Sequence, residues 1–146
     1  AGTLQKQLQD AYLFHYAGHG LFEESDSTQS ALLLADETKL SVGDILALDR
    51  VPEVVVLSAC ETATVESSSP QVGLGIAQAF LTAGAKHVIA SQRKVDDGLS
   101  RFIMEKFYTH LKHSNDLAKA LNMAQKEAYL EDPESDWSTY RLLSRY

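Results

Sequence analysis

The side chains best suited to chemistry in this chain follow two apolar segments. Residues 12–16 run into Gly18-His19-Gly20, and residues 54–57 run toward Cys60, the only cysteine. If the two segments are neighbouring parallel strands, His19 and Cys60 leave the same edge of one sheet about 5 Å apart in backbone spacing. The thiolate is the effective nucleophile, and an imidazole can remove the thiol proton. The sequence therefore predicts a Cys/His dyad.

Acyl transfer by such a dyad needs further groups. His19 can pass its proton to a leaving amine, and the backbone N–H groups of Gly20 and Cys60 are natural donors to a developing oxyanion. Gly20 has no side chain to crowd the approach. Glu61 follows Cys60 directly and is a loop carboxylate that can shape a substrate pocket.

A third apolar segment, residues 87–91, also runs into polar residues, among them Arg93 and Asp96. In open parallel sheets the functional crevice lies outside the carboxyl ends of the strands. Arg93 and Asp96 are therefore candidate substrate-binding residues. Asp96 is equally suited to cap the helix that follows it, and the two roles are compatible.

Each of these interpretations has a competing structural one. A lone cysteine after a strand is often a small buried hydrophobe, and His15 reads as a hydrogen-bonded core histidine rather than a ligand. A metal site would combine His15, His19, Cys60 and His87, but structural zinc sites show two closely spaced ligand pairs. Ser58 lacks the G-x-S-x-G context of a hydrolase serine. We therefore expect neither a metal nor another cofactor.

Composition narrows the classes of function. The chain has 146 residues, a net charge of -7 and 45% hydrophobic residues. One domain of this length can bury roughly 70% of the surface that its unfolded chain exposes, so it needs no disulfide bond to fold. The acidic balance argues against nucleic acid as a partner, and no apolar run reaches the roughly 18 residues of a membrane span. A single cysteine fits a reducing compartment, so we expect a cytoplasmic protein.

Apolar runs alternate with helical patterns along the chain. Residues 3–11 predict a helix end, and residues 12–16 predict a central strand because they show no polar face. Residues 31–35 and 39–42 predict a β-hairpin. Ser41, near its end, can cap a short helix that follows.

The remaining segments continue this alternation. They predict a strand at 54–57, a loop at 62–71, a helix at 73–83 ending at Gly84, a strand at 87–91, a helix capped by Asp96 or Asp97, a helix begun by Ser114 or Asn115, and a last strand at 137–143. Such a pattern specifies an α/β fold, with a mainly parallel sheet and helices on both faces.

Four motifs resemble the CHAT domain, a family of caspase-like cysteine peptidases related to separase and often carried beside tetratricopeptide repeats. They are HxxxHG at 15–20, VVLSACET at 55–62, GLGIAQAFLTAGAKHVIAS at 73–91 and VDD at 95–97. The resemblance covers about residues 12–143 and keeps the order of the family's motifs.

The resemblance implies a caspase-haemoglobinase-like fold with His19 as base, Cys60 as nucleophile, no third catalytic side chain and no cofactor. It also implies that residues 1–146 form one domain, the C-terminal catalytic part of a larger domain that begins with further strands. The implied partners are a protein or peptide substrate and a tetratricopeptide-repeat or other regulatory domain in the parent protein.

The chain departs from the family pattern at one place. Gln92-Arg93-Lys94 stand where the family usually has Leu-Trp-Pro. This segment borders the pocket for the residue preceding the cut bond. In separase-like relatives an acidic residue here selects a basic side chain, and Asp96 is the nearest match. Arg93 can partly neutralise it.

Two functions remain open from the sequence. The first is a cysteine endopeptidase that hydrolyses protein substrates through an acyl-enzyme. The alternative is a catalytically silent or partner-activated module of the same fold, which holds partners through the 92–97 loop or the acidic 23–28 loop. In the partner-activated case a second domain would order the 62–71 loop.

Overall fold

The structure is a computed structural model that describes residues 2–21, 30–58, 61–62, 72–91, 93 and 95–145. The chain divides into two compact units. The first comprises residues 1–94 together with 143–146, and the second comprises residues 95–142.

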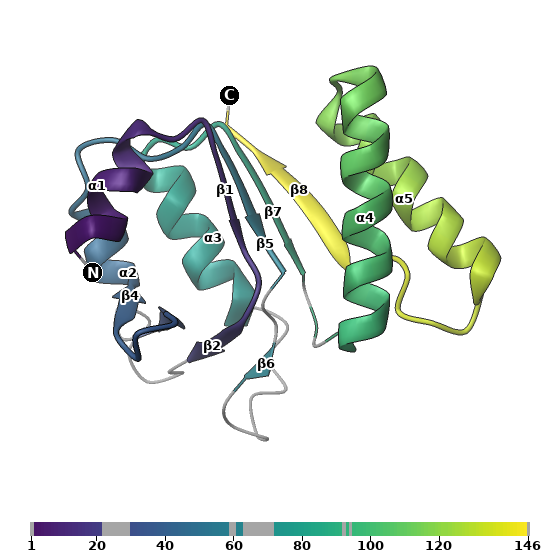
Figure 1. Cartoon of the computed structure of the whole chain (residues 1–146), viewed down its shortest axis with the longest axis horizontal. Coiled ribbons are helices and arrows are strands. Elements are labelled where there is room, and N and C mark those ends of the chain that lie inside the picture. Colours follow the sequence, from purple (N-terminus) through teal and green to yellow (C-terminus); the bar gives the residue numbers. More distant parts are fainter. Residues whose placement is uncertain are drawn as a thin grey trace. The chain divides into compact units, whose positions relative to one another are not determined.

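A four-stranded sheet has the order β1-β5-β7-β8, and β8 begins in the second unit and ends in the first (Figure 1). Its strands are β1 (Leu13–Tyr16), β5 (Val54–Leu57), β7 (His87–Ser91) and β8 (Tyr140–Ser144). β5 pairs in parallel with both β1 and β7. The Arg145 N–H donates to the Lys86 carbonyl, so the end of β8 lies beside the beginning of β7 and β8 runs antiparallel. The predicted α/β class with a mainly parallel sheet is confirmed.

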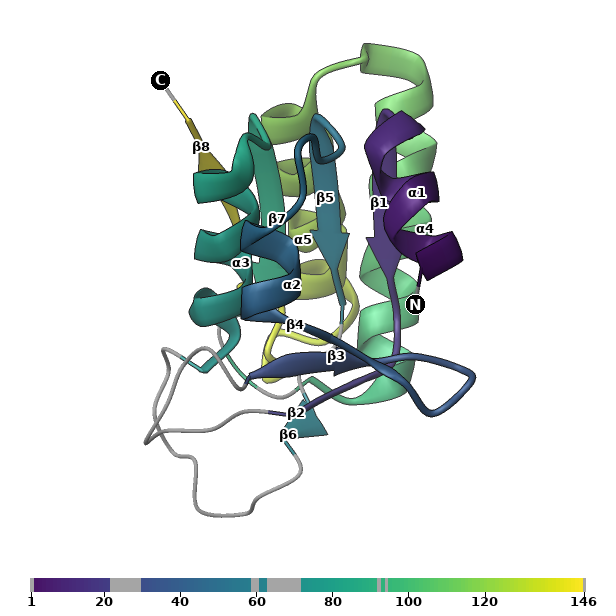
Figure 2. The ribbon, with the colours of Figure 1, turned by 90° about the vertical axis from the view of Figure 1, so that its left-hand side faces the viewer.

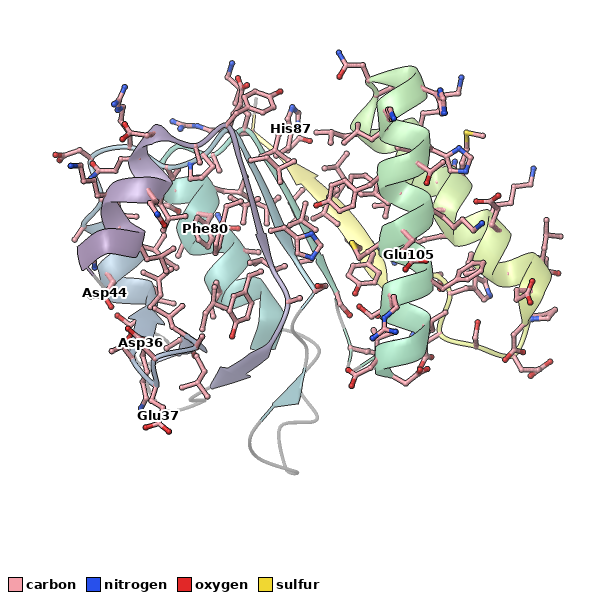
Figure 3. The ribbon with its side chains drawn as sticks, viewed as in Figure 1. Asp36, Glu37, Asp44, Phe80, His87 and Glu105 are labelled. Carbon is pink, nitrogen blue, oxygen red and sulfur yellow. The ribbon has the colours of Figure 1, made fainter. Side chains whose placement is uncertain are left out.

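Three helices of the first unit lie on one face of this sheet (Figure 1). They are α1 (Gly2–Asp10), α2 (Val42–Leu46) and α3 (Val72–Ala83). The strand residues that pack toward them alternate along each strand, as the pleat requires: Phe14, Tyr16, Val55, Leu57, Val88 and Ala90. Figure 3 shows Phe80 reaching from α3 toward the strands, and its ring centroid lies 6.1 Å from that of Phe14.

A second, smaller sheet extends two of these strands at their carboxyl ends (Figure 2). Its order is β4-β3-β2-β6, with β2 (His19–Leu21), β3 (Ala31–Leu33), β4 (Lys39–Ser41) and β6 (Glu61–Thr62). β3 and β4 form the predicted antiparallel hairpin. β6 was not expected, because the sequence predicts Glu61 as a loop carboxylate and a loop from Thr62 onward, and the prediction is wrong for these two residues. Residues 63–71 lie outside the described residues.

The local signals for two helix ends are confirmed. Ser41 caps α2 in a capping box, in which its hydroxyl accepts from the Asp44 N–H and the Asp44 carboxylate accepts from the Ser41 N–H. Gly84 ends α3 at φ 124°, a conformation that favours glycine, and its N–H donates to the Phe80 carbonyl.

The second unit contains α4 (Asp97–Ser114) and α5 (Leu117–Glu131), which are joined by a tight turn. The prediction that Ser114 or Asn115 begins the later helix is wrong. Asn115 adopts the left-handed conformation, at φ 53°, that ends α4, and Asp116 caps α5 by accepting from the Lys119 N–H. Asparagine suits both positions, so the sequence alone favoured the wrong one.

Two strand predictions also need correction. Among the described strands β1 is the outermost of its sheet rather than central, and its residues Leu13, Phe14 and His15 are only half-buried. Phe14 packs against Phe80 of α3 and Tyr16 bonds to the Leu33 carbonyl of β3, whereas Tyr12, just before the strand, is exposed. The last strand begins at Tyr140, three residues later than expected, because residues 137–139 form a turn.

Candidate active site

The smaller sheet brings the two predicted catalytic segments together. β2 pairs in parallel with β6, so that His19 lies opposite Glu61 and Gly20 lies opposite Thr62. Glu61 is the residue that follows Cys60 in the chain. Cys60 itself lies outside the described residues. The backbone of His19 is therefore placed beside the residue next to the predicted nucleophile.

The register of the two strands changes by one residue before this point. Tyr16 pairs with Leu57, numbers that differ by 41, whereas His19 pairs with Glu61, numbers that differ by 42. Two residues connect β1 to β2, whereas three residues, Ser58, Ala59 and Cys60, connect β5 to β6. A one-residue shift in a strand changes the face to which its side chains point. The segment that carries the thiol is therefore one residue longer than the segment opposite it.

Tyr16 is the last residue of β1 and links that strand to the neighbouring hairpin strand β3. The Tyr16 hydroxyl donates to the Leu33 carbonyl in β3, and β3 pairs directly with β2. The phenol crosses over Gly18, where an added Cβ would lie 2.8 Å from the hydroxyl oxygen. A side chain at Gly18 would therefore collide with the group that ties β1 to the hairpin.

Ser58 follows the last residue of β5 and is hydrogen-bonded to β1. The Ser58 N–H donates to the Tyr16 carbonyl at 2.9 Å, and the Ser58 hydroxyl donates to the same oxygen at 3.1 Å. The Nε2 of His15 lies 3.1 Å from the Ser58 hydroxyl oxygen. The prediction that His15 is a hydrogen-bonded histidine agrees with this contact.

Burial lowers the pKa of His15 below its ordinary value of 6.5, because a partly desolvated ring disfavours the charged form. A group with a lowered folded-state pKa adds stability above its unfolded pKa and loses it as pH falls toward the folded value. We therefore expect the free energy of unfolding to decrease below about pH 6.5. His15→Gln should reduce that decrease, as measured by urea unfolding between pH 7.5 and 5.5. Equal pH slopes for the two proteins would contradict this expectation.

The predicted specificity residues have defined local roles. Arg93, in the first unit, is exposed, its N–H donates to the Ser91 hydroxyl at 3.3 Å, and that hydroxyl donates back to the Arg93 carbonyl. Asp96, in the second unit, is exposed and caps α4 by accepting from the Leu99 N–H at 3.0 Å. The capping interpretation of Asp96 is confirmed, and its substrate-binding role stays a prediction.

Sequence reasoning missed the supporting residues Tyr16 and Ser58. Both lie inside the motifs, Tyr16 within HxxxHG and Ser58 two residues before Cys60. A polar residue at the end of an otherwise apolar strand was an available signal for Ser58, since a buried hydroxyl usually has a partner.

A hollow of about 610 Å³ lies within the second unit, between α5 and the segment that leads into β8. Its apolar wall includes Leu121, Tyr129 and Trp137, and none of the predicted site residues lines it. Within the described residues, no group of three or more His, Cys, Asp or Glu side chains is arranged to hold a metal ion. No helix in the described part of the chain combines the length and apolar character of a membrane span.

The family model of the CHAT domain matches residues 2–145. The chain belongs to the CHAT family. The match extends over both compact units and confirms the resemblance carried by the four motifs. Membership of the CHAT family makes the protein caspase-like and related to peptidases. A search of the curated proteins finds no match.

Proposed function

We propose that this CHAT domain is a cysteine endopeptidase that cleaves protein or peptide substrates. The observation that carries the proposal is the parallel pairing of β2 with β6, in which His19 lies opposite Glu61. Cys60 precedes Glu61 directly, so the strand that carries His19 pairs with the two residues that follow the proposed nucleophile.

The proposed reaction uses the two side chains in turn. His19 accepts the Cys60 proton, and the thiolate sulfur forms a bond to the peptide carbonyl carbon, whose oxygen becomes an oxyanion. The C–N bond then breaks as the His19 imidazolium gives its proton to the leaving amine. A water molecule, deprotonated by His19, attacks the thioester. The thiolate leaves and takes its proton back from His19, and the new carboxylic acid gives its proton to solvent and is released as a carboxylate.

The oxyanion requires donors at the site. We assign this role to the N–H groups of Cys60 and Gly20. Gly20 lies in β2 between β3 and β6, so its N–H points along the sheet toward one of these strands.

Substrate preference in this proposal depends on polar groups in β6 and after β7. Glu61 is next to the nucleophile, and Arg93 is an exposed cation on a turn fixed by Ser91. Asp96 is an exposed carboxylate at the beginning of α4, where it would favour a basic substrate residue. A tetratricopeptide-repeat or other regulatory domain in the parent protein and a reducing, cytoplasmic location complete the proposal.

The test is turnover on a mixture of peptides of diverse sequence, with new termini read by mass spectrometry. The wild-type chain should produce new termini with a common residue before the cut. Cys60→Ala should abolish them, because no other thiol is present. His113→Ala, which alters an exposed histidine in the last turn of α4, is the matched control and should keep full activity.

Cleavage that persists in folded Cys60→Ala would contradict the proposal. Absence of cleavage by the folded wild-type chain, both alone and in its full-length parent, would instead favour the silent module of the same fold. Cleavage by the full-length parent alone would identify a peptidase that its partner domain activates.

A further inference from the structure

His15 and Ser58 form a side-chain pair at the point where β1 and β5 end. The pair crosses between the two strands that continue toward the proposed dyad. His15 stands four residues before His19, and Ser58 stands two residues before Cys60. The contact therefore lies directly behind both proposed catalytic residues along the chain.

The direction of the hydrogen bonds follows from the groups available. The Tyr16 carbonyl can only accept, and the Ser58 hydroxyl has one proton, which it donates to that oxygen. The Ser58 oxygen must then accept from His15, so the His15 Nε2 carries a proton. Ser58 is consequently fixed by its own N–H, by its hydroxyl proton and by the His15 ring.

This fixed residue is the first of the three that separate the paired residues Leu57 and Glu61 along the chain. With Ser58 held at one end and Glu61 paired with His19 at the other, the segment between them has both ends defined. Without these contacts of Ser58, the extra residue could be accommodated at another position along the strand. In a strand, a change of one residue in register turns the side chains that follow to the opposite face.

We propose that His15 and Ser58 are positioning residues, which hold the shifted segment so that the Cys60 thiol meets the His19 imidazole. This inference rests on the proposed function. Neither residue touches the substrate in this scheme. Their effect is transmitted through the backbone between Ser58 and Glu61.

The test measures the Cys60 thiol rather than turnover. Iodoacetamide alkylates thiolates, and its rate against pH gives the apparent pKa of the only thiol in the chain. In the wild-type chain the thiol pKa should lie below about 8.5, and His19→Ala should bring it up to that value. Ser58→Ala and His15→Leu should raise it by at least about half a unit. His15→Gln, which keeps an N–H donor, should recover most of the wild-type value.

The control uses a second Ser–His pair in the same sheet. The Nδ1 of His87 lies 2.9 Å from the Ser144 hydroxyl oxygen, at the beginning of β7 and far along the strands from β2 and β6 (Figure 3). Ser144→Ala removes the same kind of contact and should leave the thiol pKa at the wild-type value. Circular dichroism and thermal unfolding establish that each variant is folded. If Ser58→Ala does not fold, the difference in thiol pKa between His15→Leu and His15→Gln tests the positioning role.

The outcomes separate the two proposals. A thiol pKa that responds to His19→Ala but not to Ser58→Ala or His15→Leu overturns the positioning role alone. An equal increase of the thiol pKa in Ser144→Ala also overturns the positioning role, since a general loss of stability would then explain the increase. A thiol pKa that does not respond to His19→Ala contradicts the dyad and the positioning role together.

Discussion

Replacement of His19 by alanine is expected to slow peptide hydrolysis by about 10²- to 10⁴-fold at neutral pH, the range associated with loss of a general acid and base. Without the imidazole, the Cys60 thiol stays mostly protonated and the leaving amine departs without a proton donor. The loss should appear in kcat more than in KM, because His19 acts on the reacting atoms rather than on the rest of the substrate.

Two controls make this result specific to the imidazole. Free imidazole can supply the missing acid and base, so added imidazole should restore part of the rate lost in His19→Ala without restoring it in Cys60→Ala. His113→Ala changes an exposed histidine and should match the wild-type rate. A His19→Ala variant with a rate within threefold of wild type would contradict the assignment of His19 as the base.

Gly18→Ala is expected to destabilise the chain by about 1–3 kcal/mol, the usual cost of forcing a methyl group into an occupied space. The new Cβ would lie 2.8 Å from the Tyr16 hydroxyl oxygen and 3.0 Å from its Cζ. The Tyr16 side chain is 8% exposed and bonded to the Leu33 carbonyl, so it cannot swing aside without losing that bond. Urea unfolding followed by circular dichroism measures the change.

A matched control and a double mutant identify the cause. Gly75→Ala makes the same change within α3, where nothing lies within 4 Å of the added Cβ, and should stabilise the chain by about 0.5–1 kcal/mol. Tyr16→Phe removes the nearest clashing atom, so the double variant with Gly18→Ala should lose less than the sum of the two single losses. Strict additivity would show that Tyr16 is not the obstacle.

Gly18→Ala should also reduce turnover more than its loss of stability explains. Gly18 directly precedes His19, and the Tyr16–Leu33 bond ties β1 to the hairpin strand that pairs with β2. A displaced phenol therefore moves the strand that carries the base. Comparison with a variant of equal stability loss elsewhere, at a temperature where both are folded, separates this effect from unfolding.

Much of the fold could be predicted because local signals and long-range packing agree. The apolar run at Val54–Leu57 is buried at every position, as expected of a strand covered on both faces. Ser41 and Gly84 occupy the cap positions that their chemistry favours. The four motifs also led to the CHAT family, which the match over residues 2–145 confirms.

The errors occurred where two outcomes have similar local energies. Asn115 is favourable both at the beginning of a helix and in the left-handed conformation that ends one, and packing of α4 on α5 decided the case. The strand Glu61–Thr62 is too short for any periodicity to appear, and it exists because β2 lies beside it.

The arrangement of the candidate site could be predicted only in part. Parallel strands ending near His19 and Cys60 were expected, and the pairing of β1 with β5 confirms the first step. The one-residue shift in register could not be predicted, because it depends on how two segments of unequal length join the same pair of ladders. The positioning roles that we propose for His15 and Ser58 depend on that shift, although the hydrogen-bonded state of His15 was predicted.

The central claim is that Cys60 and His19 act together on peptide carbonyl groups. Mass spectrometry after exposure to peptidyl acyloxymethyl ketones tests it most directly, with basic, acidic and apolar residues placed before the reactive group in turn. We predict labelling of Cys60 that depends on the peptide sequence and is lost in His19→Ala, with the basic peptide preferred if Asp96 lines the pocket. Labelling that is equal in His19→Ala and the wild-type chain, or a folded full-length protein that no peptide labels, would contradict the claim.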